Sequence, residues 1–272
     1  MKARRIGTLV SVLGVALLAT GLFASPASAI KAGYERFAGC PSPEENPSVF
    51  ICQRAVIDGG HFQMGSKDVP ITNPITLSGG VTFDGKVFAN SKGGLTPVKQ
   101  LVPGGIIGLT GLDWLVDFLN LEGLKLYAVT ELAGQPLITE GGTGLELPVR
   151  VHLVNPVLGN SCYVGSFASP IKLNLTYGTT KPPAPNKPIS GTEPTKAASD
   201  LPGVVRGENG VLVDNSFAAP GANGCTLTLF GFIPFSLNGL VNSQSGLPAA
   251  AGTNETKQNL DLEITVPSVV YP

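Results

Sequence analysis

Two histidines, His61 and His152, are the only imidazoles in this 272-residue chain, so histidine chemistry must use one of them. Asp58 precedes His61 in the run Asp-Gly-Gly-His, and a carboxylate beside an imidazole in a flexible loop suits a metal or an acid–base pair. The ordinary alternative is that His61 lies on the solvent side of a strand edge. For His152, which alternates with Arg150, we expect a surface position on the polar face of a strand. His61 and Asp58 are therefore the catalytic candidates of the sequence.

Other catalytic chemistries leave no complete motif in the sequence. Gly65-Ser66 and Gly165-Ser166 do not complete the Gly-x-Ser-x-Gly elbow of a serine hydrolase. The paired glycines are not phosphate loops, because none precedes Lys-Ser or Lys-Thr. Two carboxylates for glycoside hydrolysis would meet only in the fold. We expect no cofactor.

Two apolar segments supply the binding candidates. The first is an expected short helix over 112–121, entered from the glycine-rich run 104–108, and the second is the segment 226–237, which Gly231 and Pro234 interrupt. If exposed, their aromatic side chains could contact lipid, an apolar ligand or a partner. The favoured alternative is that they plug one end of a β core. The binding candidates are Trp114, Phe118, Phe230, Phe232 and Phe235.

Residues 1–29 have the order of a secretory signal peptide, with a basic start, an uncharged apolar run over 8–23 and a cleavage point between Ala29 and Ile30. The apolar run is short for a membrane span of about 20 residues. Cleavage removes three of the 18 basic residues and leaves 15 against 19 acidic residues, a net charge of −4. This mildly acidic balance argues against nucleic acid as a partner. We expect a secreted protein that is extracellular or loosely associated with the cell envelope.

Four cysteines in an oxidising compartment predict two disulfides. Their spacings of 12, 110 and 63 residues contain no Cys-x-x-Cys pair, so we expect no metal site. Of the three possible pairings, Cys40–Cys52 is the natural local closure, because its loop contains three prolines. Cys162–Cys225 then follows by elimination. On the chain-entropy model the two bridges contribute about 3 and about 4 kcal/mol.

Several segments alternate apolar and polar residues with a period of two, which is typical of a half-buried antiparallel strand. The clearest are 260–266, 171–177 and 149–153, with weaker examples at 124–130 and 71–77. Asp84-Gly85 predicts a hairpin with a two-residue type I′ turn, and Asn209-Gly210 predicts a hairpin with a slightly longer loop. About eight to ten such strands predict a mainly β fold, an antiparallel β-sandwich or barrel with one or two short helices.

The proline-rich stretch 178–196 bears on the number of domains. Residues 30–272 are enough for one large or two small domains, and such a stretch would ordinarily be a linker between two. If Cys162 and Cys225 are joined, however, the two sides of the stretch are tied together. We therefore predict a single β-rich domain over 30–272, with 178–196 as an excursion across its surface.

Four strings stand out together: Ile-Cys-Gln-Arg-Ala-Val at 51–56, Gly-His-Phe-Gln-Met-Gly at 60–65, Cys-Tyr-Val-Gly-Ser at 162–166 and Gly-Leu-Pro-Ala-Ala-Ala-Gly-Thr-Asn at 246–254. In these strings the chain resembles a group of secreted proteins from actinobacteria, over nearly all of residues 30–272. The resemblance implies bacterial secretion and supports two disulfides. It implies no particular activity and no catalytic residue.

These features predict a non-catalytic binding or structural protein of the envelope or extracellular space, with lipid, a wall component or an apolar ligand as its partner. The first alternative is a secreted hydrolase of an envelope polymer or ester, which predicts a cleft where His61 or paired carboxylates converge. Binding instead predicts an apolar pocket or patch without them. The second alternative, an oligomeric envelope channel, is disfavoured because runs of about 5–7 residues are shorter than the roughly 9–11 that spanning strands need.

Overall fold

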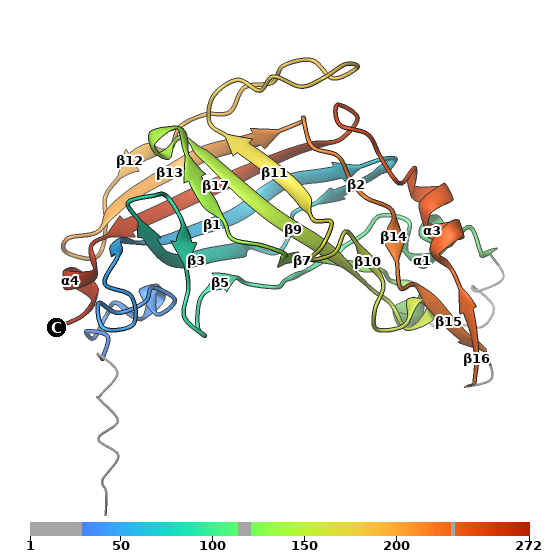
Figure 1. The fold of residues 1–272 in the computed structure, drawn as a ribbon, viewed down its shortest axis with the longest axis horizontal. Helices are drawn as coiled ribbons and strands as arrows, with labels where there is room; N and C mark the ends of the chain where they lie inside the picture. Colours follow the sequence, from blue (N-terminus) through green and yellow to red (C-terminus); the bar gives the residue numbers. More distant parts are fainter. Residues whose placement is uncertain (1–28, 114–120, 230–231) are drawn as a thin grey trace, which may run out of the picture.

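The computed structural model describes residues 29–113, 121–229 and 232–272. One antiparallel sheet of 15 strands dominates them, and two further strands form a small separate sheet. Figure 1 shows the large sheet curled into a half-barrel, with its long strands side by side. A mainly β, antiparallel fold with short helices and two disulfides is therefore confirmed, in the curled rather than the sandwich form. The expected signal peptide lies outside the described residues up to position 28.

The main path through the sheet is β14–β10–β9–β11–β13–β17–β1–β3–β4, and the remaining strands pair beside it. The strands are β1 (Val49–Met64), β2 (Lys67–Pro70), β3 (Ile75–Thr82), β4 (Val87–Phe88), β5 (Gly94–Leu95), β6 (Lys99–Leu101), β7 (Tyr127–Leu132), β8 (Leu137–Thr139), β9 (Gly144–Val154), β10 (Tyr163–Val164), β11 (Ile171–Thr176), β12 (Thr195–Ala197), β13 (Val205–Asp214), β14 (Ala222–Asn223), β15 (Thr226–Leu229), β16 (Ile233–Ser236) and β17 (Glu255–Thr265). The helices are η1 (Glu35–Phe37), α1 (Gly105–Thr110), α2 (Leu121–Leu124), η3 (Glu140–Gly142), η4 (Pro156–Leu158), α3 (Asn238–Ser245) and α4 (Pro267–Val270). No helix among the described residues is long and apolar enough to cross a membrane.

The longest strands exceed the expected runs of about 5–7 residues, since β1 has 16 residues and β9 and β17 have 11 each. The expectation was wrong because polar and glycine positions interrupt the alternation without ending the strand. The pairing of β1 with β17 shifts between Ile57 and Gly59, and that of β13 with β17 shifts between Gly207 and Gly210. Such bulges bend and twist a strand. Two of them on the neighbours of β17 help the sheet to curl.

Both predicted turns differ in the structure. Asn209, with φ of 59°, belongs to the bulge in β13, so Asn209-Gly210 does not form a hairpin turn. After β3, Gly85 N donates to Thr82 O (2.8 Å) and Thr82 N donates to Lys86 O (3.0 Å). These bonds enclose a loop of three residues, 83–85. Only Gly85 in this loop has a positive φ, 82°, whereas a type I′ turn needs two residues with positive φ. The loop is therefore not a type I′ turn.

Backbone hydrogen bonds join the β3–β4 edge of the sheet to β8. Val87 N donates to Pro136 O (3.0 Å), and Ile138 N donates to Gly85 O (2.7 Å). Because β8 pairs with β9, the two sides of the curled sheet meet here. The interior is therefore enclosed on this side.

Between β11 and β13 the ladder is short, with Thr176 opposite Val213 as its one registered pair among the described residues. The buried carboxylate of Asp214 adds to this seam, accepting from Asn174 N (2.7 Å) and Ser216 N (2.8 Å).

The proline-rich segment leaves the sheet beside this seam and forms the long loop at the top of Figure 1. Gly191 N donates to Gly178 O (2.9 Å) at the base of the loop. That 30–272 is a single domain stays a prediction.

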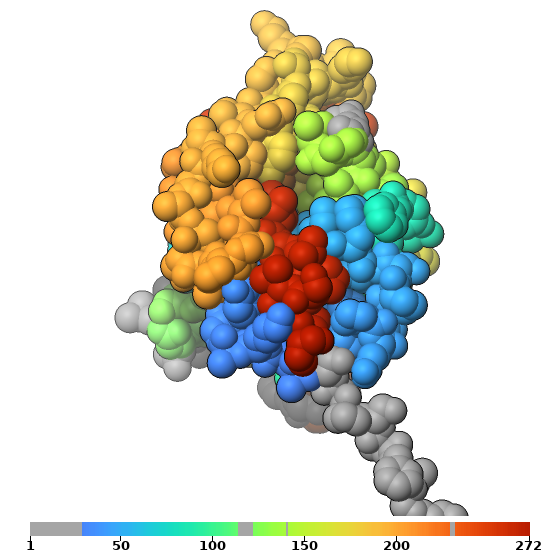
Figure 2. Space-filling view, turned by 90° about the vertical axis from the view of Figure 1, so that its left-hand side faces the viewer, coloured from blue at the N-terminus to red at the C-terminus, as the bar shows by residue number. Residues whose placement is uncertain are grey.

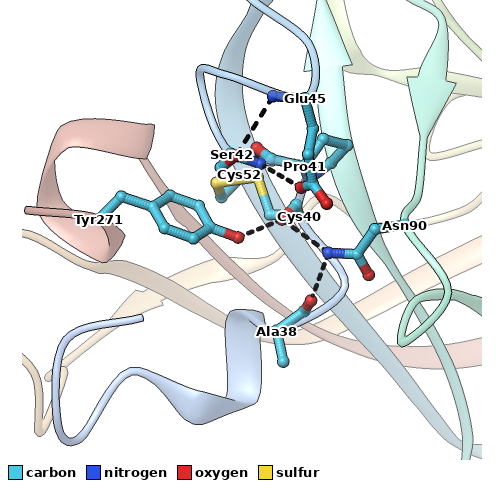
Figure 3. The surroundings of a disulfide bond; sticks show 8 residues. All are labelled: Ala38, Cys40, Pro41, Ser42, Glu45, Cys52, Asn90 and Tyr271. Carbon is cyan, nitrogen blue, oxygen red and sulfur yellow. Dashed lines mark hydrogen bonds between the residues drawn. A yellow bond between two sulfur atoms is a disulfide. The ribbon is translucent and has the colours of Figure 1, made fainter. Parts of the chain in front are cut away.

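The bridge Cys40–Cys52 fastens the N-terminal segment to β1, as predicted. Around it, Asn90 Nδ2 donates to Ala38 O (2.9 Å) and the Tyr271 hydroxyl donates to Cys40 O (Figure 3). Figure 2 looks onto this end, where the C-terminal residues lie between the N-terminal segment and the orange strands near residue 200. A small second core forms here, which includes Phe37, Val270 and both sulfurs.

The glycine-rich run 104–108, which we expected as the entry to a helix over 112–121, is itself largely helical. It begins α1, whose Ile106 and Leu109 are buried against the main core. Tertiary burial here outweighs the low helix propensity of glycine. The helix predicted over 112–121 lies mostly outside the described residues, although α2 begins at its last residue, Leu121.

Candidate functional site

The inner face of the curled sheet lines a cavity of about 470 Å³, which we name the main cavity. Its lining is mostly apolar and includes alternate residues of neighbouring strands, such as Ala55 of β1 and Leu260, Leu262 and Ile264 of β17. Apolar clefts of about 300–1,000 Å³ are the usual size of small-molecule sites. Asp84, in the turn after β3, is its one charged lining residue among those described.

A second hollow of about 330 Å³, the mouth, shares five lining residues with the main cavity and therefore adjoins it. The other walls of the mouth come from β12 and β13 and the segment before β12, and they add Glu193, Lys196 and Arg206. Arg206 is already paired with Glu208 (2.7 Å). The polar mouth and apolar interior together suit an amphiphilic molecule. The shared residues are Gly141, Gly142, Tyr177, Leu262 and Ile264.

Tyr177 follows β11 and lies at the boundary between the main cavity and the mouth. Burial raises the pKa of its hydroxyl to about 12, and the negative charge of Glu193 adds to the effect. The phenol is thus neutral at physiological pH. It offers a hydroxyl, not a charge, at the entrance to the cavity.

A smaller cavity of about 50 Å³, the inner cavity, lies further along the same strands. On each of four strands, a residue that lines the inner cavity is two positions along the chain from a residue that lines the main cavity. Residues two apart share a face of a strand and are roughly 7 Å apart along it. The two cavities therefore lie at successive levels inside the curled sheet, on the same face of these strands. The pairs, main cavity first, are Ala55 and Ile57, Leu77 and Ile75, Leu145 and Leu147, and Leu260 and Gln258.

The structure places His61 beside Asp68 and Glu255, not in a flexible loop with Asp58 as partner. His61 Nδ1 lies 2.8 Å from Asp68 Oδ1, and its Nε2 lies 3.8 Å from Glu255 Oε1. The run 58–61 belongs to β1, with Asp58 exposed at the bulge, because β2 and β17 pair with it on both sides. As far as the described residues define them, His61 lines neither the main cavity, nor the mouth, nor the inner cavity.

His152 lies on the polar face of β9, but it is packed there, with 21% of its side chain exposed. Its ring stacks on Tyr163 with centroids 4.4 Å apart. Arg150 donates to Glu131 Oε2 (2.6 and 3.0 Å), and its guanidinium lies over the rings of Tyr163 (4.2 Å) and Phe167 (4.1 Å). These contacts hold β7, β9 and β10 together on the outer face and explain His152 as a packing residue.

The hairpin of β15 and β16 carries the described aromatic binding candidates. Phe232 is 75% exposed and Phe235 is 54% exposed, so these two side chains do not plug the core. Leu227 and the fully buried Leu237 pack against the core instead. All four residues of β16 are exposed, whereas Leu227 of β15 is partly buried against the core. The other candidates, Trp114, Phe118 and Phe230, lie outside the described residues.

The main cavity was missed by the sequence interpretation, although its signal was present. The alternation over 260–266 identified Leu260, Leu262 and Ile264 as one apolar face, and these three side chains line the cavity. Periodicity identifies the face that turns inward. It carries no information on whether the opposite wall is close enough to fill the space.

The described cysteines are all in disulfides, which is consistent with an oxidising extracellular compartment. Cys162–Cys225 forms as predicted. Within the described ranges, no group of three or more His, Cys, Asp or Glu is arranged to hold a metal ion. That the protein uses no metal and no cofactor stays a prediction.

The main cavity, with its polar mouth, is thus the candidate site that the geometry favours. No family model, no curated protein and no solved structure matches this chain, so the chemistry of the site is argued from its own residues.

Proposed function

We propose that this chain is a secreted, non-catalytic binding protein of the bacterial envelope or extracellular space, with an apolar ligand inside its curled sheet. The main cavity carries the proposal, because about 470 Å³ of space lies between apolar side chains and adjoins a polar mouth. Removing apolar ligand surface from water is the main driving force for occupying such a site, roughly 25 cal/mol per Å². The two disulfides support an extracellular location.

A cavity-filling variant tests this function directly. Ala55 and Val56 are neighbours on β1, but Ala55 lines the main cavity and Val56 faces the other side of the strand. We expect Ala55→Trp to weaken binding of the fluorescent probe N-phenyl-1-naphthylamine about tenfold or more, because the indole fills the space. Val56→Trp, the matched control, should bind the probe as the wild type does. Titration by fluorescence measures both affinities.

Melting curves of both variants show whether each is folded, since overpacking costs about 1–3 kcal/mol. Equal probe binding by folded Ala55→Trp and wild type would remove the main cavity as the binding site.

The hydrolase alternative has less support. It predicted a cleft where His61 or paired carboxylates converge, whereas His61 contacts Asp68 and Glu255 away from the main cavity. The contact is a histidine between two carboxylates in neighbouring strands, and it orders this part of the sheet. An apolar interior with one charged lining residue among those described favours binding over acid–base catalysis.

Strand length no longer argues against the channel alternative, because β1, β9, β13 and β17 have 10 to 16 residues. The interior argues against it instead. Buried apolar side chains such as Val149, Leu173 and Leu260 fill much of the space within the sheet. This interior suits an apolar ligand better than a column of water.

A further inference from the structure

We propose that the inner cavity receives the hydroxyl end of a long-chain aliphatic alcohol whose chain occupies the main cavity. This proposal rests on the proposed function and names the class of ligand. The residue that carries it is Gln258 of β17, which lines the inner cavity and is 5% exposed. Its Oε1 atom is buried without a hydrogen-bond partner among the described residues.

The orientation of the Gln258 amide follows from a short chain of hydrogen bonds. Thr256 Oγ1 donates its single proton to His61 O (2.9 Å). The threonine oxygen can therefore only accept from Gln258, whose Nε2 lies 3.3 Å away. The NH₂ group is held toward Thr256, and Oε1 is the acceptor that remains. The inner cavity thus offers a fixed acceptor without a donor.

A second glutamine in the same cavity shows the contrast. Gln100 Oε1 accepts from the backbone N–H groups of Thr72 (2.9 Å) and Asn73 (3.0 Å), and Gln100 Nε2 donates to Asn73 O (2.7 Å). Gln100 therefore ties the segment after β2 to β6 with both ends of its amide. Within the part of the chain that the structure describes, Gln258 has no comparable partner for its oxygen. A buried acceptor is costly unless a donor meets it.

The surroundings of Gln258 select a neutral donor. Ile57, Phe62 and Leu173 are among the apolar residues around it, and they disfavour a charged group in the same space. A carboxylate would also present only acceptors to Oε1, whereas a hydroxyl provides one proton. The inner cavity of about 50 Å³ holds a hydroxymethyl group, because one water molecule takes about 30 Å³ in the liquid.

The length of the interior favours an extended chain. Ile264 lies at the mouth and Gln258 lines the inner cavity, six residues earlier on β17. Six residues of strand span roughly 20 Å. An unbranched, extended chain on the order of 16 carbons has this length. Each C–C bond of about 1.5 Å is inclined to the chain axis, so it adds less than 1.5 Å to the length of the chain.

The test compares 1-hexadecanol with its methyl ether, which keeps the chain and removes the donor. Each compound displaces N-phenyl-1-naphthylamine from the full chain, and we expect the wild type to prefer the alcohol about 3- to 10-fold. Gln258→Leu should bind both compounds equally. Asn259→Leu, the control, removes an amide from the next residue, which is exposed, and should keep the preference. Gln258→Met gives a second apolar replacement if the leucine variant does not fold.

The outcomes separate this proposal from the proposed function. Equal displacement by alcohol and ether in the wild type overturns the alcohol proposal, as does a preference that survives in folded Gln258→Leu or Gln258→Met. If neither compound displaces a probe whose binding depends on Ala55, the inner-cavity proposal fails and binding in the main cavity stands. If folded Ala55→Trp binds the probe with the same affinity as the wild type, both proposals fail.

Discussion

At the scale of single residues, Tyr177 connects the chemistry of the site to the stability of the fold. Its ring packs against the main core, and its position is shared by the main cavity and the mouth. Burial near Glu193 raises the pKa of its hydroxyl from 10.0 to about 12, because the phenolate is poorly solvated there. In the unfolded chain the same phenol returns to its ordinary pKa. The two states therefore bind protons differently above pH 10.

This difference gives a prediction for alkaline stability. Below pH 10 the phenol is neutral in both states, so its contribution is fully present; between pH 10 and about 12 only the unfolded state loses the proton. We expect the free energy of unfolding to fall over this range by up to about 3 kcal/mol through Tyr177. In Tyr177→Phe, the fall in the free energy of unfolding over the same pH range should be smaller by up to about 3 kcal/mol. Urea unfolding at several pH values measures both proteins, and parallel curves would contradict the raised pKa.

At the scale of elements, bulges and hairpins decide which apolar residues meet. The bulges at Asp58 and Asn209 keep β1 and β13 paired with β17, where the sequence suggested a loop and a turn. The hairpin of β15 and β16 behaves differently, because among the described residues its two strands pair only with each other. At its outer side are Phe232 and Phe235, and the described part of the hairpin has no charged residue. An exposed apolar surface of this kind suits contact with an apolar partner, which the proposed envelope location would supply.

The prediction at this scale concerns retention by the envelope. We expect Phe232→Ser with Phe235→Ser to change the free energy of unfolding by no more than about 0.5 kcal/mol, because both side chains are exposed. The same variant should shift the protein from the wall and membrane fractions of a bacterial culture to the medium. Leu101→Ser is the control, since Leu101 is 47% exposed but lies in β6, outside the hairpin. An unchanged distribution would remove the hairpin as a retention surface.

At the scale of the whole molecule, the two disulfides fasten opposite regions of the sheet. Cys40–Cys52 holds the N-terminal segment against β1 at the end that α4 also covers. Cys162–Cys225 joins the chain before β10 to the chain before β15. The second bridge encloses the proline-rich segment in its 63-residue loop. Both bridges are fully buried.

Replacing each bridge separately tests their contributions. We expect Cys162→Ala with Cys225→Ala to lower the free energy of unfolding by about 4 kcal/mol, and Cys40→Ala with Cys52→Ala by about 3 kcal/mol, because longer loops lose more entropy on closure. Denaturant titration measures these values, and non-reducing mass mapping confirms the remaining bridge in each variant. Equal losses would show that local packing, not loop length, sets their contribution.

Much of the fold was predictable because its signals are local. Alternation located β17, β11 and the centre of β9, and loop composition together with elimination gave both disulfide pairings. The weaker segments were displaced, since β7 begins at Tyr127 and β3 at Ile75. Turn chemistry misled at Asn209-Gly210, because a residue with positive φ serves a bulge as well as a hairpin.

The sequence alone determined which side of each clear strand is apolar, how the cysteines pair and that β structure dominates. Only the tertiary structure decided that the apolar sides of β1, β3, β9 and β17 surround a cavity, and that Gln258 lies within the interior with an acceptor that no described residue meets. The physical reason is distance along the chain. Local patterns fix the direction of a side chain, whereas the width of a cavity depends on curvature and on strands that are remote in sequence.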